Sequence, residues 1–219
     1  LLRIGCQFHW HNRGYPDFDS FLEALTSAKR KNIRRERRRV AEAGVSFRLL
    51  DGRSATAGDW TVFHRLYEST FHRRGGIPTL SLGFFRKIAQ DMPESVLLIM
   101  AEHQGRPVAA AFCLVGEDTL YGRHWGCSEH FDNLHFEACY YQGLDFCIRR
   151  KLAHFEPGAQ GEHKIARGFL PTRTLSAHWL ADEPFSQAIG RHLEHERAGM
   201  REYIREMQGH SPYRSTGPT

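Results

Sequence analysis

The chain has 219 residues, enough for one large domain or one and a half small ones with a sizeable core. Its hydrophobic content of 41% and charged content of 25% are ordinary for a soluble globular protein. The longest apolar runs, 96–101 and 108–115, have the length of strands, so no segment is expected to span a membrane. The five cysteines are scattered and include no C-x-x-C pair, which indicates a reducing compartment and predicts a cytoplasmic location.

Two further features concern the start of the chain and its charge. The chain begins at Leu1 without a methionine, which we interpret as the start of a fragment of a longer protein. The stretch 29–39 carries a net charge of +7, whereas the whole chain carries +5 and the remainder therefore −2. The basic character of the protein is thus concentrated in one segment.

Alternating polarity predicts strands, and apolar residues at helical spacing predict helices. In chain order we expect a strand at 4–12, a helix at 18–43 that stops at Gly44, a strand at 45–50, helices at 57–73 and 82–92, strands at 95–103, 107–115 and 119–127, a buried helix at 134–152, strands at 154–156 and 174–181, and a helix at 185–207. Short turns separate the three strands between 95 and 127, which predicts an antiparallel meander. The predicted fold class is mixed α/β, with helices flanking the sheet.

The basic part of the first helix favours an anionic partner over a merely solvated face, because its cations outnumber any acidic neighbours in the sequence. RNA, a nucleotide and a phospholipid surface all remain open. No aromatic residue lies between Lys29 and Val40, so phosphate contact is expected rather than base stacking. We expect the side chains to be solvated, so that replacing them hardly affects folding. The candidate phosphate-binding residues are Lys29, Arg30, Arg34, Arg35, Arg37 and Arg38.

The segment after the strand at 154–156 is crowded with ionisable side chains. Pro157, Gly158 and Gly161 allow the backbone to turn sharply and to approach a ligand closely. Loops that follow a strand often hold the sites of α/β proteins, which makes this loop the main candidate. The alternative is a surface turn whose charges are solvated.

The order of these elements resembles the GNAT acyltransferase fold. In that fold the sheet splays open between the strand before the buried helix and the strand after it, and an acyl donor lies in the gap. Here the gap is expected between 119–127 and 154–156. The resemblance places a pyrophosphate-binding loop at 127–136, but this sequence has no glycine there and has the acidic residues Glu129 and Asp132. Such a loop is a poor cradle for the phosphates of acetyl-CoA.

Several motifs resemble the FemAB-like proteins, and more narrowly the bacterial group described as peptidoglycan biosynthesis/recognition proteins. The motifs are Phe8-His9-Trp10, the basic run 29–37, Gly122-Arg123-His124-Trp125-Gly126, and the segments 155–164 and 167–171. Characterised relatives transfer amino acids from aminoacyl-tRNA to peptidoglycan precursors and dispense with the pyrophosphate loop. Fem proteins carry two GNAT-like domains in tandem, and this chain resembles the second. The resemblance implies a GNAT-like acyltransferase domain at 45–208. The sequence pattern itself places a strand and loop at 1–16, a basic helix at 17–44 and a disordered tail at 209–219.

Transfer of an acyl group to an amine needs a base, positive charge for the developing oxyanion and a wall that orients the donor. Glu156 or His163 is the candidate base, and Lys164 is the candidate oxyanion stabiliser, expected on the surface so that its loss spares stability. The candidate donor is acyl-CoA or aminoacyl-tRNA. The wall is assigned to His124 and Trp125, and the candidate substrate-binding residues are His124, Trp125, Gln160, Glu162 and Arg167. The alternative places Trp125 in the core and leaves Lys164 and Arg167 solvated.

Other chemistries have less support. The sequence has no Gly-x-Ser-x-Gly elbow, and the histidine pairs 9/11 and 192/195 lack the further ligands of a metal site, so no metal is expected. Three hypotheses follow: a FemAB-like acyl- or aminoacyltransferase, which leads; a non-catalytic module that binds RNA or another polyanion; and a structural half of a larger tandem-GNAT protein.

Overall fold

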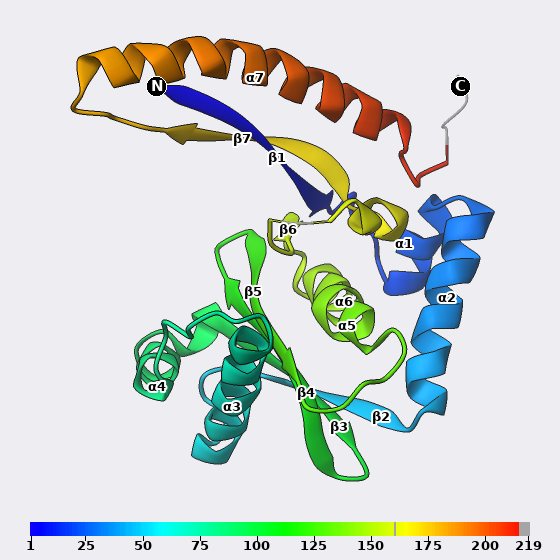
Figure 1. The fold of residues 1–219 in the computed structure, drawn as a ribbon. Coiled ribbons are helices and arrows are strands. Elements are labelled where there is room, and N and C mark those ends of the chain that lie inside the picture. Colours follow the sequence, from blue (N-terminus) through cyan, green and yellow to red (C-terminus); the bar gives the residue numbers. More distant parts are fainter. Residues whose placement is uncertain (160, 215–219) are drawn as a thin grey trace. The chain divides into compact units, whose positions relative to one another are not determined.

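The computed structural model describes residues 1–159 and 161–214 (Figure 1). The chain forms two compact units. The larger unit is the continuous segment from His11 to Pro157, and the smaller combines Leu1–Trp10 with the segment that starts at Gly158. The division between the units therefore falls inside the range 45–208 that the sequence assigned to one domain.

Five strands form the sheet of the larger unit, in the order β2-β3-β4-β5-β6. Antiparallel neighbours are β2 (Val45–Leu50), β3 (Val96–His103), β4 (Arg106–Val115) and β5 (Thr119–Cys127). The short strand β6 (His154–Glu156) runs parallel to β5. The predicted α/β class and the antiparallel meander are confirmed.

Helices cover both faces of this sheet (Figure 1). They are α1 (Phe18–Ala24), α2 (Ser27–Glu42), α3 (Ala57–Arg73), α4 (Leu82–Asp91), the 3-10 turn η1 (Pro93–Ser95), α5 (Leu134–Phe136), the π-helical turn η2 (Glu137–Tyr141) and α6 (Gln142–Arg150). On one face, Phe63 of α3 and Phe85 of α4 pack against Met100 and Phe112. On the other face, Val40 of α2 packs with strand residues and Leu134.

The predicted single helix at 18–43 is wrong, because the chain forms two helices separated at Leu25 and Thr26. Leu25 is extended (ψ 157°) and fully buried, so the helix is interrupted at a core position. Thr26 is the residue before α2, a position that threonine favours. Gly44 follows the second helix with φ +73°, as the predicted stop requires.

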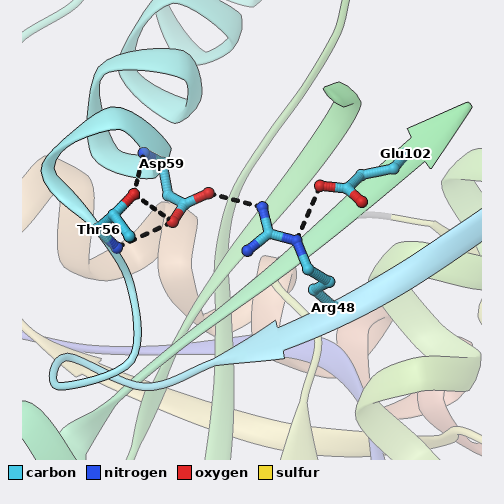
Figure 2. Close-up of polar contacts among 4 residues, drawn as sticks. All are labelled: Arg48, Thr56, Asp59 and Glu102. Carbon is cyan, nitrogen blue, oxygen red and sulfur yellow. Dashed lines mark hydrogen bonds and ion pairs between the residues drawn. The ribbon is translucent and has the colours of Figure 1, made fainter. Parts of the chain in front are cut away.

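A polar network joins β2, β3 and the start of α3 (Figure 2). Arg48 on β2 donates hydrogen bonds to Asp59 Oδ1 at 2.7 Å and to Glu102 Oε1 at 2.8 Å. Asp59 and Thr56 also form a capping box, in which each side chain accepts a hydrogen bond from the other residue's backbone N–H. Burial alone would raise the pKa of Asp59, but the hydrogen bonds from Arg48 and Thr56 outweigh it and lower that pKa.

In the smaller unit, β1 (Leu2–His11) pairs antiparallel with β7 (Leu170–Ala177), and α7 (Glu183–Gly209) follows β7. Arg3 of β1 forms an ion pair with Glu196 of α7, whose closest N···O distance is 2.6 Å. The smaller unit also contains the 3-10 helix η3 (Glu162–Arg167), which periodicity did not predict. The strand β7 begins at Leu170 rather than at Thr174, since Pro171 is tolerated near the start of a strand.

The predicted disordered tail at 209–219 is wrong for its first part. The helix α7 continues to Gly209, and Tyr213 is buried with its hydroxyl donating to the Gly168 carbonyl at 2.7 Å. A hydrogen-bonded aromatic side chain stabilises an ordered segment. Residues 215–219 of the predicted tail lie outside the described residues.

All five cysteines lie in the described part of the chain and are free thiols. Within residues 1–159 and 161–214, no helix combines the length and the apolar character needed to cross a bilayer. Nor do three or more His, Cys, Asp or Glu side chains of those residues gather as they would around a metal ion.

Candidate functional site

The strands β5 and β6 stay together over only three residues. The last pair is Tyr121 with Glu156, and β5 then continues to Cys127 while β6 ends. Gly122 passes close to the chain after β6, since a Cβ at Gly122 would lie only 3.1 Å from Pro157 Cα. The pairing of the two strands therefore ends where the resemblance to the GNAT fold places the splay.

Beyond Gly122, β5 presents His124 and Trp125 to opposite faces of the sheet. The ring of His124 lies 4.8 Å from that of Tyr67 and stacks on Phe112 at 6.3 Å, on the side of α3 and α4. Trp125 instead meets His135 edge-on at 5.4 Å and packs on the cluster of α2. Adjacent residues of a strand alternate between faces, so the prediction that these two rings form one wall is wrong.

Burial lowers the pKa of His124, and the nearby charge of Arg123 lowers it further. Arg123 is the residue at which β4 and β5 change register, because Phe112 pairs with His124 whereas Cys113 pairs with Gly122. A bulge of this kind bends a strand and disrupts its pairing locally. His124 thus remains a neutral imidazole near neutral pH on the bulged half of β5.

The remaining predicted site residues are divided between the two units. Glu156 is half-buried at the end of β6 in the larger unit, and Gln160 lies outside the described residues. The other members belong to η3 in the smaller unit, and they are Glu162, His163, Lys164 and Arg167.

Two cations of η3 are buried, which corrects the expectation that Lys164 lies on the surface and the alternative that both are solvated. Lys164 is 2% exposed and Arg167 is 6% exposed. The Lys164 ammonium donates to the Gly158 carbonyl at 2.5 Å, and Arg167 Nη1 donates to the His163 carbonyl at 2.8 Å. The two carbonyls replace water as hydrogen-bond partners of the buried cations. The backbone changes direction at Gly158 (φ +102°) and Gly161 (φ +108°), close to both cations in the sequence.

The other two ionisable side chains of η3 are exposed. Partial burial lowers the pKa of His163, and the positive charges of Arg167 and Lys164 lower it further. Glu162 accepts a hydrogen bond from the hydroxyl of Tyr203 on α7 at 2.7 Å. Burial and this bond raise the pKa of Tyr203 to about 12, so its hydroxyl keeps its proton. The sequence singled out neither Tyr203 nor Tyr213, because each reads as part of a surface helix or a tail.

The basic helix α2 is not uniformly solvated. Arg37 donates from Nε to both carboxylate oxygens of Glu137 at 3.2 Å, and its guanidinium lies 4.3 Å above the ring of Phe18. The Glu137 side chain is 4% exposed, and burial raises the pKa of its carboxyl while Arg37 opposes that rise. The expectation that Arg37 lies on a solvated face is therefore wrong.

The neighbouring residue Glu36 also points into the protein. It is buried and accepts hydrogen bonds from the hydroxyl of Tyr141 and from Asn32 Nδ2, the latter at 2.7 Å. Glu137 and Tyr141 are the first and last residues of the π-helical turn, which therefore holds α2 at two successive residues. π-Helical turns inside helices often mark functional positions.

The other candidate cations of α2 differ in their partners. Arg34 pairs with Asp19 at 3.0 Å and Arg38 with Glu42 at 3.6 Å, both on the surface. Exposed pairs of this kind are weak and easily exchanged for another anion. The cations of α2 that have no acidic partner among the described residues are Lys29, Arg30, Lys31, Arg35 and Arg39.

The sequence matches the model of the FemAB-like family, described as peptidoglycan biosynthesis/recognition, over residues 1–215. The chain belongs to the FemAB-like family. No curated protein sequence matches it.

Solved structures support the FemAB-like fold at low sequence identity. FemX is 12% identical with a TM-score of 0.57, over 84% of this chain and 63% of FemX. L-PGS from Bacillus licheniformis is 10% identical with a TM-score of 0.59, over 88% of this chain and 66% of L-PGS. The C-terminal domain of an Agrobacterium fabrum protein, a candidate lysylphosphatidylglycerol synthetase, is 12% identical with a TM-score of 0.51, over 72% of this chain and 48% of the domain. The chain thus spans about half to two thirds of these structures.

Proposed function

We propose that this FemAB-like chain is the GNAT-like part of an acyl- or aminoacyltransferase that acts on an amine in peptidoglycan precursor metabolism. The observation that carries the proposal is that the pairing of β5 with β6 ends at Tyr121 and Glu156, while β5 continues to Cys127. In the GNAT fold, which this chain resembles, the acyl donor lies between the two strands at this position. Membership of the family and the similarity to FemX support the same reaction class.

In the proposed reaction, the amine nitrogen attacks the carbonyl carbon of the donor, and a tetrahedral oxyanion forms. The amine proton passes to a base, and the bond from the carbonyl carbon to the donor's oxygen or sulfur then breaks. His163, whose pKa is lowered, or Glu156 at the end of β6 takes the proton. Lys164 is the proposed stabiliser of the oxyanion, because its ammonium is a positive charge held in a buried position by a backbone carbonyl.

The donor that the sequence favours is aminoacyl-tRNA rather than acyl-CoA. Glu129 and Asp132 are exposed in the turn before α5, where a pyrophosphate would otherwise bind. The surface of α2 offers cations for phosphates instead, among them Lys31, Arg35 and Arg39. Titration with charged tRNA, uncharged tRNA and acetyl-CoA, followed by hydrogen exchange, separates these donors.

The proposal predicts that charged tRNA slows exchange both in α2 and in the segment 153–170, whereas uncharged tRNA slows it in α2 alone. Equal protection of α2 by both tRNAs, with no change in 153–170, supports the alternative of a non-catalytic polyanion-binding module. Protection of 153–170 by acetyl-CoA alone assigns the acyl-CoA donor. Absence of protection by all three contradicts the proposed transfer.

A further inference from the structure

Two tyrosines of the C-terminal segment contact the two ends of η3. Tyr203 Oη on α7 donates to Glu162 Oε1 at 2.7 Å, and Glu162 is the first residue of η3. Tyr213 Oη donates to the Gly168 carbonyl at 2.7 Å, and Gly168 caps the last turn of η3. One segment of the chain, 203–213, thus reaches both ends of a six-residue helix.

The helix η3 is a single short 3-10 segment of six residues. At its ends, Lys164 N–H donates to the Gly161 carbonyl at 3.1 Å, Gly168 N–H to the Ile165 carbonyl at 3.0 Å and Phe169 N–H to the Lys164 carbonyl at 3.3 Å. Short 3-10 segments have poor hydrogen-bond geometry and gain little from propagation. Contacts from outside therefore decide whether such a segment holds one conformation.

The two contacts differ in their surroundings. Tyr213 is buried and binds a backbone carbonyl, so it fixes the backbone where the chain turns left-handed at Gly168 (φ +97°). Tyr203 binds a carboxylate on the exposed side of η3, and charge-assisted bonds of this kind are stronger than neutral ones. Between these two points lie the buried ammonium of Lys164 and the carbonyl of His163 that Arg167 holds.

We infer that Tyr203 and Tyr213 are positioning residues that hold the two ends of η3 and so fix Lys164 and His163 for transfer. The effect on transfer rests on the proposed function. The ordering of η3 by the two hydroxyls does not depend on any reaction. On this inference, the segment 210–214 belongs to the site through Tyr213.

The test uses Tyr203→Phe, Tyr213→Phe and the double variant, each of which keeps the ring and removes only the hydroxyl. Glu196→Gln is the matched control, because it weakens another contact of α7, the ion pair with Arg3, about 10 Å along the helix from Tyr203. Hydrogen exchange in the peptide 161–169 is the first readout. We expect exchange there to quicken at least fivefold in each tyrosine variant, most in the double variant, and to stay unchanged in Glu196→Gln.

Steady-state transfer from charged tRNA is the second readout. Displacement of a catalytic group by about 1 Å lowers turnover by roughly a hundredfold, so kcat should fall by ten- to a hundredfold in the double variant with KM nearly constant. Faster exchange together with no transfer in the unaltered protein contradicts the proposed function and leaves the positioning contacts standing. Unchanged exchange in 161–169 contradicts the positioning role, whatever the activity. Tyr203 is half-buried, so its variant remains interpretable if the Tyr213 variants unfold.

Discussion

Replacing Lys31, Arg35 and Arg39 with Gln tests whether α2 binds phosphates. All three are exposed and have no acidic partner among the described residues. They stand four residues apart, so they follow one side of the helix at about 6 Å intervals. The triple variant therefore removes charge from the surface without disturbing the pair between Arg37 and Glu137.

The magnitude follows from counterion release. Each phosphate contact contributes about 0.7 to the slope of log K against log salt for single strands and about 0.9 for duplexes, so three lost contacts flatten the slope by roughly 2 to 3. Between 50 and 200 mM salt, the unaltered protein should therefore lose about 20- to 40-fold more affinity than the variant. The free energy of unfolding should hardly change, since surface substitutions usually shift it by no more than about 0.5 kcal/mol. Removing like charges that stand four residues apart also relieves their mutual repulsion.

Fluorescence anisotropy with a labelled RNA oligonucleotide across this salt range measures the slope. Arg37→Gln is the control, because it leaves the buried carboxylate of Glu137 without its cation and should cost roughly 1–3 kcal/mol of stability. An unchanged slope in the triple variant would refute the assignment of α2 as a phosphate-binding surface. If only Arg37→Gln flattened the slope of log K against log salt, Arg37 would be the phosphate-binding cation. That result would refute the assignment of Arg37 to a structural role and of the three exposed cations to phosphate binding.

Three further outcomes concern stability, measured by urea denaturation. Asp59→Asn should cost roughly 1–3 kcal/mol at pH 7, because Arg48 loses a charged partner, and the cost should vanish as pH falls through the lowered pKa of Asp59. Glu137 has a raised pKa, so its contribution to stability should fall as pH rises from the ordinary pKa of Glu to that raised value, and Glu137→Gln should lack this slope. Gly126→Ala should cost about 1–3 kcal/mol because its Cβ would overlap the Leu66 carbonyl, whereas Gly199→Ala, in open space on α7, should gain about 0.5–1 kcal/mol. For either carboxyl, a pH slope of the reverse sign would contradict the packing described, and so would equal effects of the two glycine changes.

Sequence periodicity located most elements because each has one strong apolar face. The strand β5 and the helix α3 have the predicted bounds, since turn residues or a capping box mark their ends. The break at Leu25 escaped prediction because the apolar spacing of Phe18, Phe21, Leu22 and Leu25 continues without interruption across it. Only Thr26-Ser27, a pair suited to the start of a helix, could have indicated it.

The strand order around the candidate site was predicted better than the surroundings of its side chains. The resemblance gave the position of the splay, because strand order depends on the pattern of elements along the chain. The burial of Lys164 could not be read from the sequence, since it depends on the Gly158 carbonyl being turned toward the ammonium. Arg37 posed the same difficulty, because its partner Glu137 lies 100 residues away in a π-helical turn.

The most direct test of the transferase account is the turnover of Lys164→Met, with labelled aminoacyl-tRNA as donor and a peptidoglycan precursor peptide as acceptor. Met preserves the buried stem and removes only the ammonium, which Lys164→Ala would not do. Lys87→Met, at an exposed position on α4, is the control. The account predicts that Lys164→Met lowers turnover by about two to three orders of magnitude with donor affinity nearly constant, and that Lys87→Met leaves turnover unchanged. Equal turnover in a folded Lys164→Met protein and in the unaltered chain would contradict it.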